Sequence, residues 1–135
     1  MGKYKLYSYH RKSEQAIHYG STYVEFNSDS ILLCDEYEWD DGDGDHIVDG
    51  EDSYLISSEI FNDLLILIPD NYKERNIFTD FEHSNDFYNE LNNENEKMLF
   101  ICLLNIYKKH SCFNGLINII NKNKLPYEDK SWSYP

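Results

Sequence analysis

The pattern of hydrophobic and polar positions changes once along the chain, near residue 57. Before that point apolar and polar residues alternate with a period of two, which is typical of half-buried strands. We expect strands at residues 3–7, 21–26 and 31–39, and a returning strand at 46–48 and 53–56. His10 to Gln15 is polar and is expected to form a turn or loop, and the turn formers Asn27 to Ser30 are expected to form a turn.

After residue 57 the apolar spacing becomes helical. Ile60 to Ile68 predicts a helix that Ser57 or Ser58 caps and that ends before Pro69. Tyr72 to His83 fits neither pattern, and Ser84 to Leu91 predicts a short helix.

Glu94 to His110 has the clearest helical pattern of the chain. Its segment Met98 to Leu104 is apolar on nearly every side, so we expect the buried central helix there, with Phe100, Leu103 and Leu104 inside. A break at Ser111 or Gly115 precedes a last helix through Leu116 to Ile120. The polar segment Lys124 to Pro135 is expected to end loosely.

Strands followed by helices predict an α+β fold, in which C-terminal helices pack on one face of an N-terminal antiparallel sheet. The 135 residues fit one domain. We expect mainly strands at 1–56, mainly helices at 57–122 and a tail at 123–135.

The negative charge is concentrated in the first half of the chain. The formal net charge is −13, yet residues 13–72 hold 16 acids and no Lys or Arg. Within Asp35 to Asp52, ten of 18 residues are acidic. Such crowding of like charges costs stability, and the tract is either a solvated loop kept for solubility or a functional surface.

Aromatic residues lie among these acids, as they do in many protein-binding surfaces. The two Asp-Gly steps after Asp40 predict a tight turn, so the tract is expected to form an exposed hairpin. The candidate partner-binding residues are Asp35, Glu36, Tyr37, Glu38, Trp39, Asp40, Asp41, Asp43, Asp45, Asp49, Glu51 and Asp52.

A calcium loop of the EF-hand type starting at Asp41 would need Gly at its sixth position and Glu at its twelfth. Here His46 and Asp52 occupy those positions, and a predicted strand precedes the loop where an EF-hand has a helix. We therefore expect no metal site and no other cofactor, apart from weak association of cations with the carboxylates.

Catalytic and nucleic-acid-binding patterns are absent from the sequence. No phosphate loop, nucleophile elbow or zinc spacing occurs, so we expect no enzyme. Direct nucleic-acid binding needs a basic surface, which this chain lacks.

Three widely spaced cysteines, Cys34, Cys102 and Cys112, indicate reduced thiols and a reducing compartment. With no signal peptide and no apolar run longer than Leu64 to Ile68, we expect a cytoplasmic protein that does not enter a membrane.

This overall profile resembles the bacterial toxin-immunity proteins, of the colicin type or of contact-dependent growth inhibition. The resemblance covers the profile of the chain and no single motif. It implies a basic protein partner, namely a cognate toxin domain such as a nuclease with a basic cleft. The alternatives are a nucleic-acid mimic of the anti-restriction or anti-CRISPR type, and a calcium-binding module.

Overall fold

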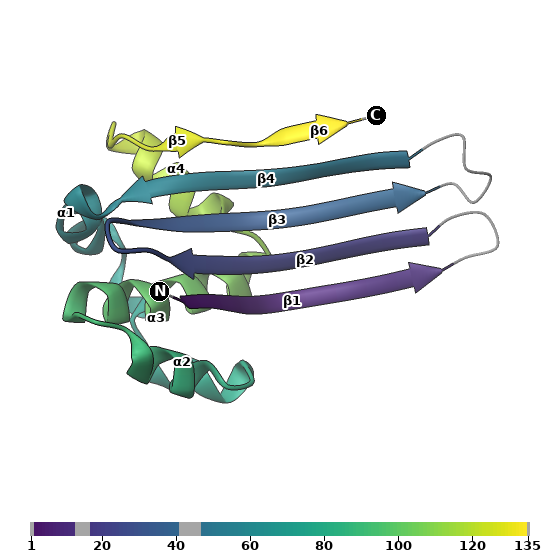
Figure 1. Cartoon of the computed structure of the whole chain (residues 1–135). Helices are drawn as coiled ribbons and strands as arrows, with labels where there is room; N and C mark the ends of the chain where they lie inside the picture. The colour runs from purple at the N-terminus through teal and green to yellow at the C-terminus, as the bar shows by residue number, and fades with distance from the viewer. Residues whose placement is uncertain (1, 13–16, 41–46, 135) are drawn as a thin grey trace.

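An antiparallel sheet with helices on one face forms the molecule (Figure 1). The computed structural model describes residues 2–12, 17–40 and 47–134. The strands are β1 (Gly2–Lys12), β2 (Ile17–Phe26), β3 (Ser30–Asp40), β4 (Ile47–Ser57), β5 (Glu128–Asp129) and β6 (Trp132–Tyr134). They follow the order β1-β2-β3-β4-β5, and β6 also pairs with β4. The predicted α+β class is confirmed.

The helical layer follows β4 without a long connection. Its elements are η1 (Ser58–Ile60), α1 (Phe61–Leu67), η2 (Asp70–Tyr72), η3 (Arg75–Asp80), α2 (Ser84–Glu90), α3 (Glu94–His110) and α4 (Asn114–Lys122). Ser57 caps η1 by accepting a hydrogen bond from the backbone N–H of Glu59. The chain breaks at Ser111, which has a left-handed φ of 57°, and Gly115 lies inside α4.

The helix α3 is the centre of the core, as its sequence predicts. Phe100, Leu103 and Leu104 are fully buried. Phe100 packs against Tyr4 of β1 and Phe26 of β2, with ring centroids 5.3 Å and 6.0 Å away. Asn93 caps the helix by accepting from the backbone N–H of Glu96 at 2.9 Å. These contacts fix the sheet against the helices.

Two expectations about the strands are wrong. Residues His10 to Lys12 continue β1 and pair with Ile17 to Tyr19 of β2, because ladder pairing outweighs the weak strand propensity of polar residues. The remainder of the expected loop, 13–15, lies outside the described residues. The polar end of the chain forms β5 and β6 on the outer edge of β4, where the backbone N–H of Lys130 donates to the carbonyl of Ser53 at 2.8 Å.

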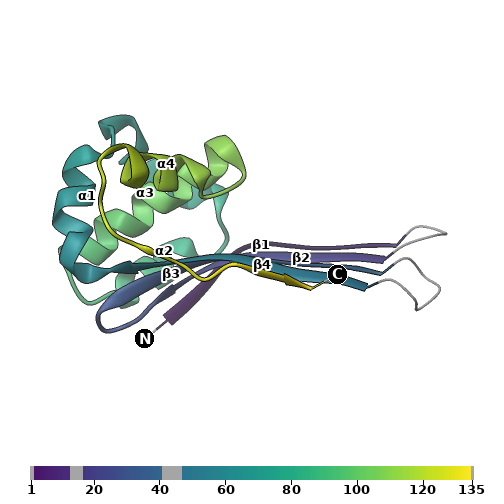
Figure 2. The ribbon, with the colours of Figure 1, turned by 90° about the horizontal axis from the view of Figure 1, so that it is seen from above.

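One half of the sheet projects past the helices (Figure 2). On the helix-facing side of β3, Ile31 and Leu33 are fully buried, whereas Asp35 and Tyr37 further along are only half-buried. We call the paired segments 35–40 of β3 and 47–52 of β4 the acidic extension. The expected hairpin is confirmed by the pairing of Asp40 with Ile47.

Candidate partner-binding surface

The strand register places acids directly opposite acids in the acidic extension. The cross-strand pairs are Asp35 with Asp52, Glu36 with Glu51, and Glu38 with Asp49. Directly opposite side chains in an antiparallel pair have Cβ atoms about 4.5–5.5 Å apart, and like charges there are destabilising. The register therefore makes the extension electrostatically unfavourable on its own.

Alternation along the strands divides these acids between the two faces of the sheet. Asp35 and Asp52 share the helix-facing side with Ile31 and Leu33. The other four acids, Glu36, Glu38, Asp49 and Glu51, lie on the side that no described helix covers, which we call the open face (Figure 2). Carboxylates thus line both sides of the projecting half of the sheet.

In the helix-facing pair, Asp35 is half-buried whereas Asp52 is exposed. Asp35 accepts a hydrogen bond from the hydroxyl of Thr22 on β2. Burial raises the pKa of the Asp35 carboxyl, and the neighbouring charge of Asp52 adds to the rise, while the Thr22 hydroxyl opposes it. The negative charge of Asp35 is therefore disfavoured in the folded protein.

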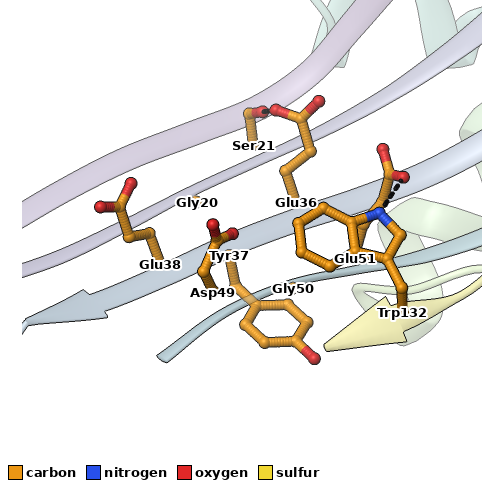
Figure 3. Close-up of a pocket in the computed structure, with 9 residues that line it drawn as sticks. All are labelled: Gly20, Ser21, Glu36, Tyr37, Glu38, Asp49, Gly50, Glu51 and Trp132. Carbon is orange, nitrogen blue, oxygen red and sulfur yellow. Dashed lines mark hydrogen bonds between the residues drawn. The ribbon is translucent and has the colours of Figure 1, made fainter. Parts of the chain in front are cut away.

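On the open face, the acids surround a pocket of about 330 Å³ (Figure 3). Its lining residues are Gly20, Ser21, Glu36, Tyr37, Glu38, Asp49, Gly50, Glu51 and Trp132. Gly20, Tyr37 and Gly50 are one cross-strand row. In that row the Tyr37 ring points to the opposite side of the sheet from the carboxylates, so the backbone of this row forms the floor (Figure 3). We call this hollow the open-face pocket.

Hydrogen bonds hold two of the pocket's carboxylates in place. Glu36 accepts from the hydroxyl of Ser21 at 3.1 Å. Glu51 accepts from the indole N–H of Trp132 at 2.9 Å and from the thiol of Cys34 at 2.8 Å. Within the described part of the chain, the carboxylates of Glu38 and Asp49 make no hydrogen bond or ion pair.

Beneath the carboxylates lies a buried thiol on the open face. Cys34 is fully buried beside Tyr23. Burial, followed by the hydrogen bond to Glu51, raises the pKa of the Cys34 thiol to about 12. Burial is also the largest cause that raises the pKa of the Tyr23 hydroxyl. At neutral pH both groups are therefore protonated; the Cys34 thiol donates to Glu51, and the hydroxyl of Tyr23 is hydrogen-bonded to Cys34.

One group of potential metal ligands comes together among the described residues. Ligand atoms of Cys34, Glu36 and Glu51 lie within 4.8 Å of one another. A metal bound here would take up the thiolate of Cys34, whose thiol in this structure donates to Glu51. The two segments that flank residues 41–46 are strands β3 and β4, where an EF-hand has helices.

No ion pair between described residues neutralises the acidic extension. The pairs that the structure shows involve acids of the helical layer and of β5, such as Lys108 with Asp80 at 2.7 Å and Lys130 with Glu128 at 3.7 Å. The basic residues Lys73, Lys97, Lys108 and Lys109 all belong to the helical half of the chain. The charge of the extension is thus available to an external cation.

The structure brings together only part of the predicted partner-binding set. Glu36, Glu38, Asp49 and Glu51 line the open-face pocket, while Asp35 and Asp52 lie on the other side. Trp39 and Asp40 are the last residues of β3, and Asp41, Asp43 and Asp45 lie outside the described residues.

The ring of Tyr37 lies on the opposite side of the sheet from the carboxylates of the open-face pocket, because it packs over Gly50 on the side of Asp35 and Asp52. Sequence reasoning missed Trp132 and Ser21. Trp132 was the harder to foresee, since its segment is polar and its strand has only three residues. In the sequence, the feature that points to Trp132 is an aromatic residue within an otherwise polar segment.

Comparison with known proteins gives no relative for this fold and site. No family model matches the chain, and neither a curated protein nor a solved structure matches it. In the described residues, no helix has the length and apolar character needed to cross a membrane.

Proposed function

We propose that this protein binds and neutralises a bacterial toxin domain with a basic cleft, such as a nuclease, in the manner of an immunity protein. The observation that carries the proposal is the set of facing acid pairs in the acidic extension. No ion pair within the described residues compensates them, and one of their two faces is uncovered.

Binding of a basic partner offsets the electrostatic repulsion between the paired acids. Like charges opposite each other destabilise the free protein. A cleft that binds phosphates is lined by Lys and Arg side chains. These positive charges relieve the repulsion between the carboxylates when they approach them. Binding is therefore favoured by the same charges that weaken the isolated fold, and the long-range field accelerates the encounter.

The proposed function also implies a cellular location and a class of protein that binds without catalysis. An immunity protein acts in the cell that makes the toxin, so we propose the cytoplasm as its location. In this role the protein needs no catalytic group, cofactor or direct contact with nucleic acid, because its contacts are with the toxin.

A nucleic-acid mimic is the second candidate, and the spacing of the acids favours it. Successive open-face acids on one strand are two residues apart, which is about 6.6–6.8 Å. That is twice the roughly 3.4 Å rise per nucleotide of one DNA strand. The two candidates differ in the partner: a mimic inhibits many enzymes that bind nucleic acid, whereas an immunity protein blocks its cognate toxin alone.

Growth protection tests the proposal. The protein is co-expressed with a candidate toxin, taken from a neighbouring gene that encodes one, and two variants with the same loss of charge are compared. The face variant carries Glu36→Gln, Glu38→Gln, Asp49→Asn and Glu51→Gln. The control variant carries Asp63→Asn, Glu74→Gln, Glu82→Gln and Glu90→Gln, all at exposed positions of the helical half.

We expect the wild type and the control variant to protect cells and the face variant to fail, with circular dichroism showing that all three are folded. Full protection by a folded face variant would contradict the proposal. Protection against unrelated nucleases as well would favour the mimic.

A further inference from the structure

The open face presents a charged hollow beside an aromatic ring. Among the described residues that line it, the open-face pocket has four carboxylates and no Lys, Arg or His. The indole of Trp132 forms part of the same lining and is 48% exposed. We propose that this pocket receives an arginine side chain of the basic partner. The inference rests on the proposed function and names the group that the site recognises.

The carboxylates are arranged for a flat, multiply donating cation. A guanidinium has five N–H donors in a fixed plane and binds carboxylates through paired hydrogen bonds. Glu36 and Glu51 face each other across β3 and β4, and Glu38 and Asp49 form the next pair on the same face. A guanidinium between the two rows therefore reaches acids on both strands and relieves their repulsion.

Trp132 adds the surface on which a guanidinium stacks. Its indole N–H is already bound to Glu51 at 2.9 Å, which fixes the ring while leaving part of it exposed. Arginine stacks on aromatic faces more readily than lysine, because its cation is planar and weakly hydrated. The attraction of a cation to an indole face strengthens when water is excluded from the contact.

The C-terminal strand holds this ring in place. Trp132 pairs with Glu51 in the register of β6 and β4. The preceding residue, Ser131, accepts at its hydroxyl from the backbone N–H of Ser53 at 3.1 Å. The tail therefore contributes a recognition residue to a pocket whose acids come from strands far away in the sequence.

A titration with short peptides of equal charge tests the inference on the unmodified protein. The probes are tetra-arginine and tetra-lysine peptides with blocked ends, measured by calorimetry at physiological salt. We expect the arginine peptide to bind about tenfold more tightly, which corresponds to about 1.4 kcal/mol from paired hydrogen bonds and stacking. The NMR signal of the Trp132 indole N–H, assigned with Trp132→Phe, is expected to shift only with arginine.

Variants separate recognition from charge. Glu51→Gln and Trp132→Ala are expected to abolish most of the preference for arginine, whereas Asp63→Asn on α1 is expected to keep it. If both peptides bind equally and the variants change nothing, the arginine pocket is refuted while the acidic surface stands. If neither peptide binds, both the pocket and the proposed function fail. If Mg²⁺ or Zn²⁺ displaces the arginine peptide and binds more tightly, the pocket is a metal site and the inference is wrong.

Discussion

At the scale of single residues, Gly50 shows how closely the acidic extension is packed. A Cβ atom at this position would lie 2.4 Å from Cζ and Oη of Tyr37. The ring therefore uses the space that glycine leaves, an arrangement in which an aromatic side chain covers a strand glycine. Gly50 also belongs to the floor of the open-face pocket, so its packing bears on the site.

We predict that Gly50→Ala destabilises the protein by about 1–3 kcal/mol, because the new methyl group forces Tyr37 out of its position. Denaturant unfolding measures the change. Tyr37→Ala in the same chain is expected to remove most of the penalty, since the clash then disappears. Equal penalties with and without Tyr37 would show that the ring does not limit this site.

The raised pKa of Asp35 predicts a specific pH dependence of stability. The ordinary aspartate pKa is 3.8, and burial raises that of Asp35 in the folded protein. Its contribution to stability is therefore fully present below pH 3.8 and is lost as the pH rises through the folded value. At neutral pH the charged form is unfavourable, so Asp35→Asn is expected to be more stable than the wild type at pH 7, with a gap that closes toward pH 4.

Asp129 supplies the matched control, because its pKa shift has the opposite sign. Hydrogen bonds from Ser131 lower the pKa of this exposed carboxyl, so its contribution is present above pH 3.8 and is lost as the pH falls. Asp129→Asn is therefore expected to be less stable than the wild type at pH 7. Thermal melting from pH 3 to pH 8 checks both variants, and a shift of the same sign in the two would contradict the assignment.

At the scale of elements, strong local patterns predict the fold and weak ones do not. Glu94 to His110 is a helix at the predicted bounds, because its apolar segment and its end signals agree. The strand at His10 to Lys12 and the strands β5 and β6 were missed, because pairing with a neighbour and not local propensity forms them. The pocket combines acids of the predicted tract with Trp132 from such a missed strand, which is why only its acids were foreseen.

Removal of residues 128–135 tests the role of the C-terminal strands. The truncated chain is expected to lose at least about 1 kcal/mol of stability with the backbone bonds to β4. It is also expected to self-associate, because the edge of β4 becomes free to pair. Thermal melting and size-exclusion chromatography measure the two effects, with Ser131→Ala as the milder control. A truncated chain that melts and elutes like the full chain would show that the tail does not protect this edge.

At the scale of the whole molecule, charge and architecture are distributed in the same way. The ion pairs between described residues lie in the helical layer and the C-terminal segment, whereas the acidic extension in the projecting half holds seven acids and no Lys or Arg. The sequence predicts the acidic hairpin but not its projection past the helices, because the helical layer's position depends on tertiary packing. A sheet that extends beyond its helices presents carboxylates on two faces, which suits insertion into a basic cleft.

The dissociation constant of the complex with the purified toxin domain tests the central claim most directly. The wild type, the face variant and the control variant are compared by calorimetry at physiological salt. We predict that the face variant binds at least about 100-fold more weakly, which is a loss of ~2.7 kcal/mol of binding free energy. The reason is that Lys and Arg side chains of the partner lose the carboxylates they pair with. The control variant is expected to stay within about threefold of the wild type, since it changes only the long-range field. Equal affinities for all three proteins, or equal losses in the two variants, would contradict the claim that the open face is the binding surface.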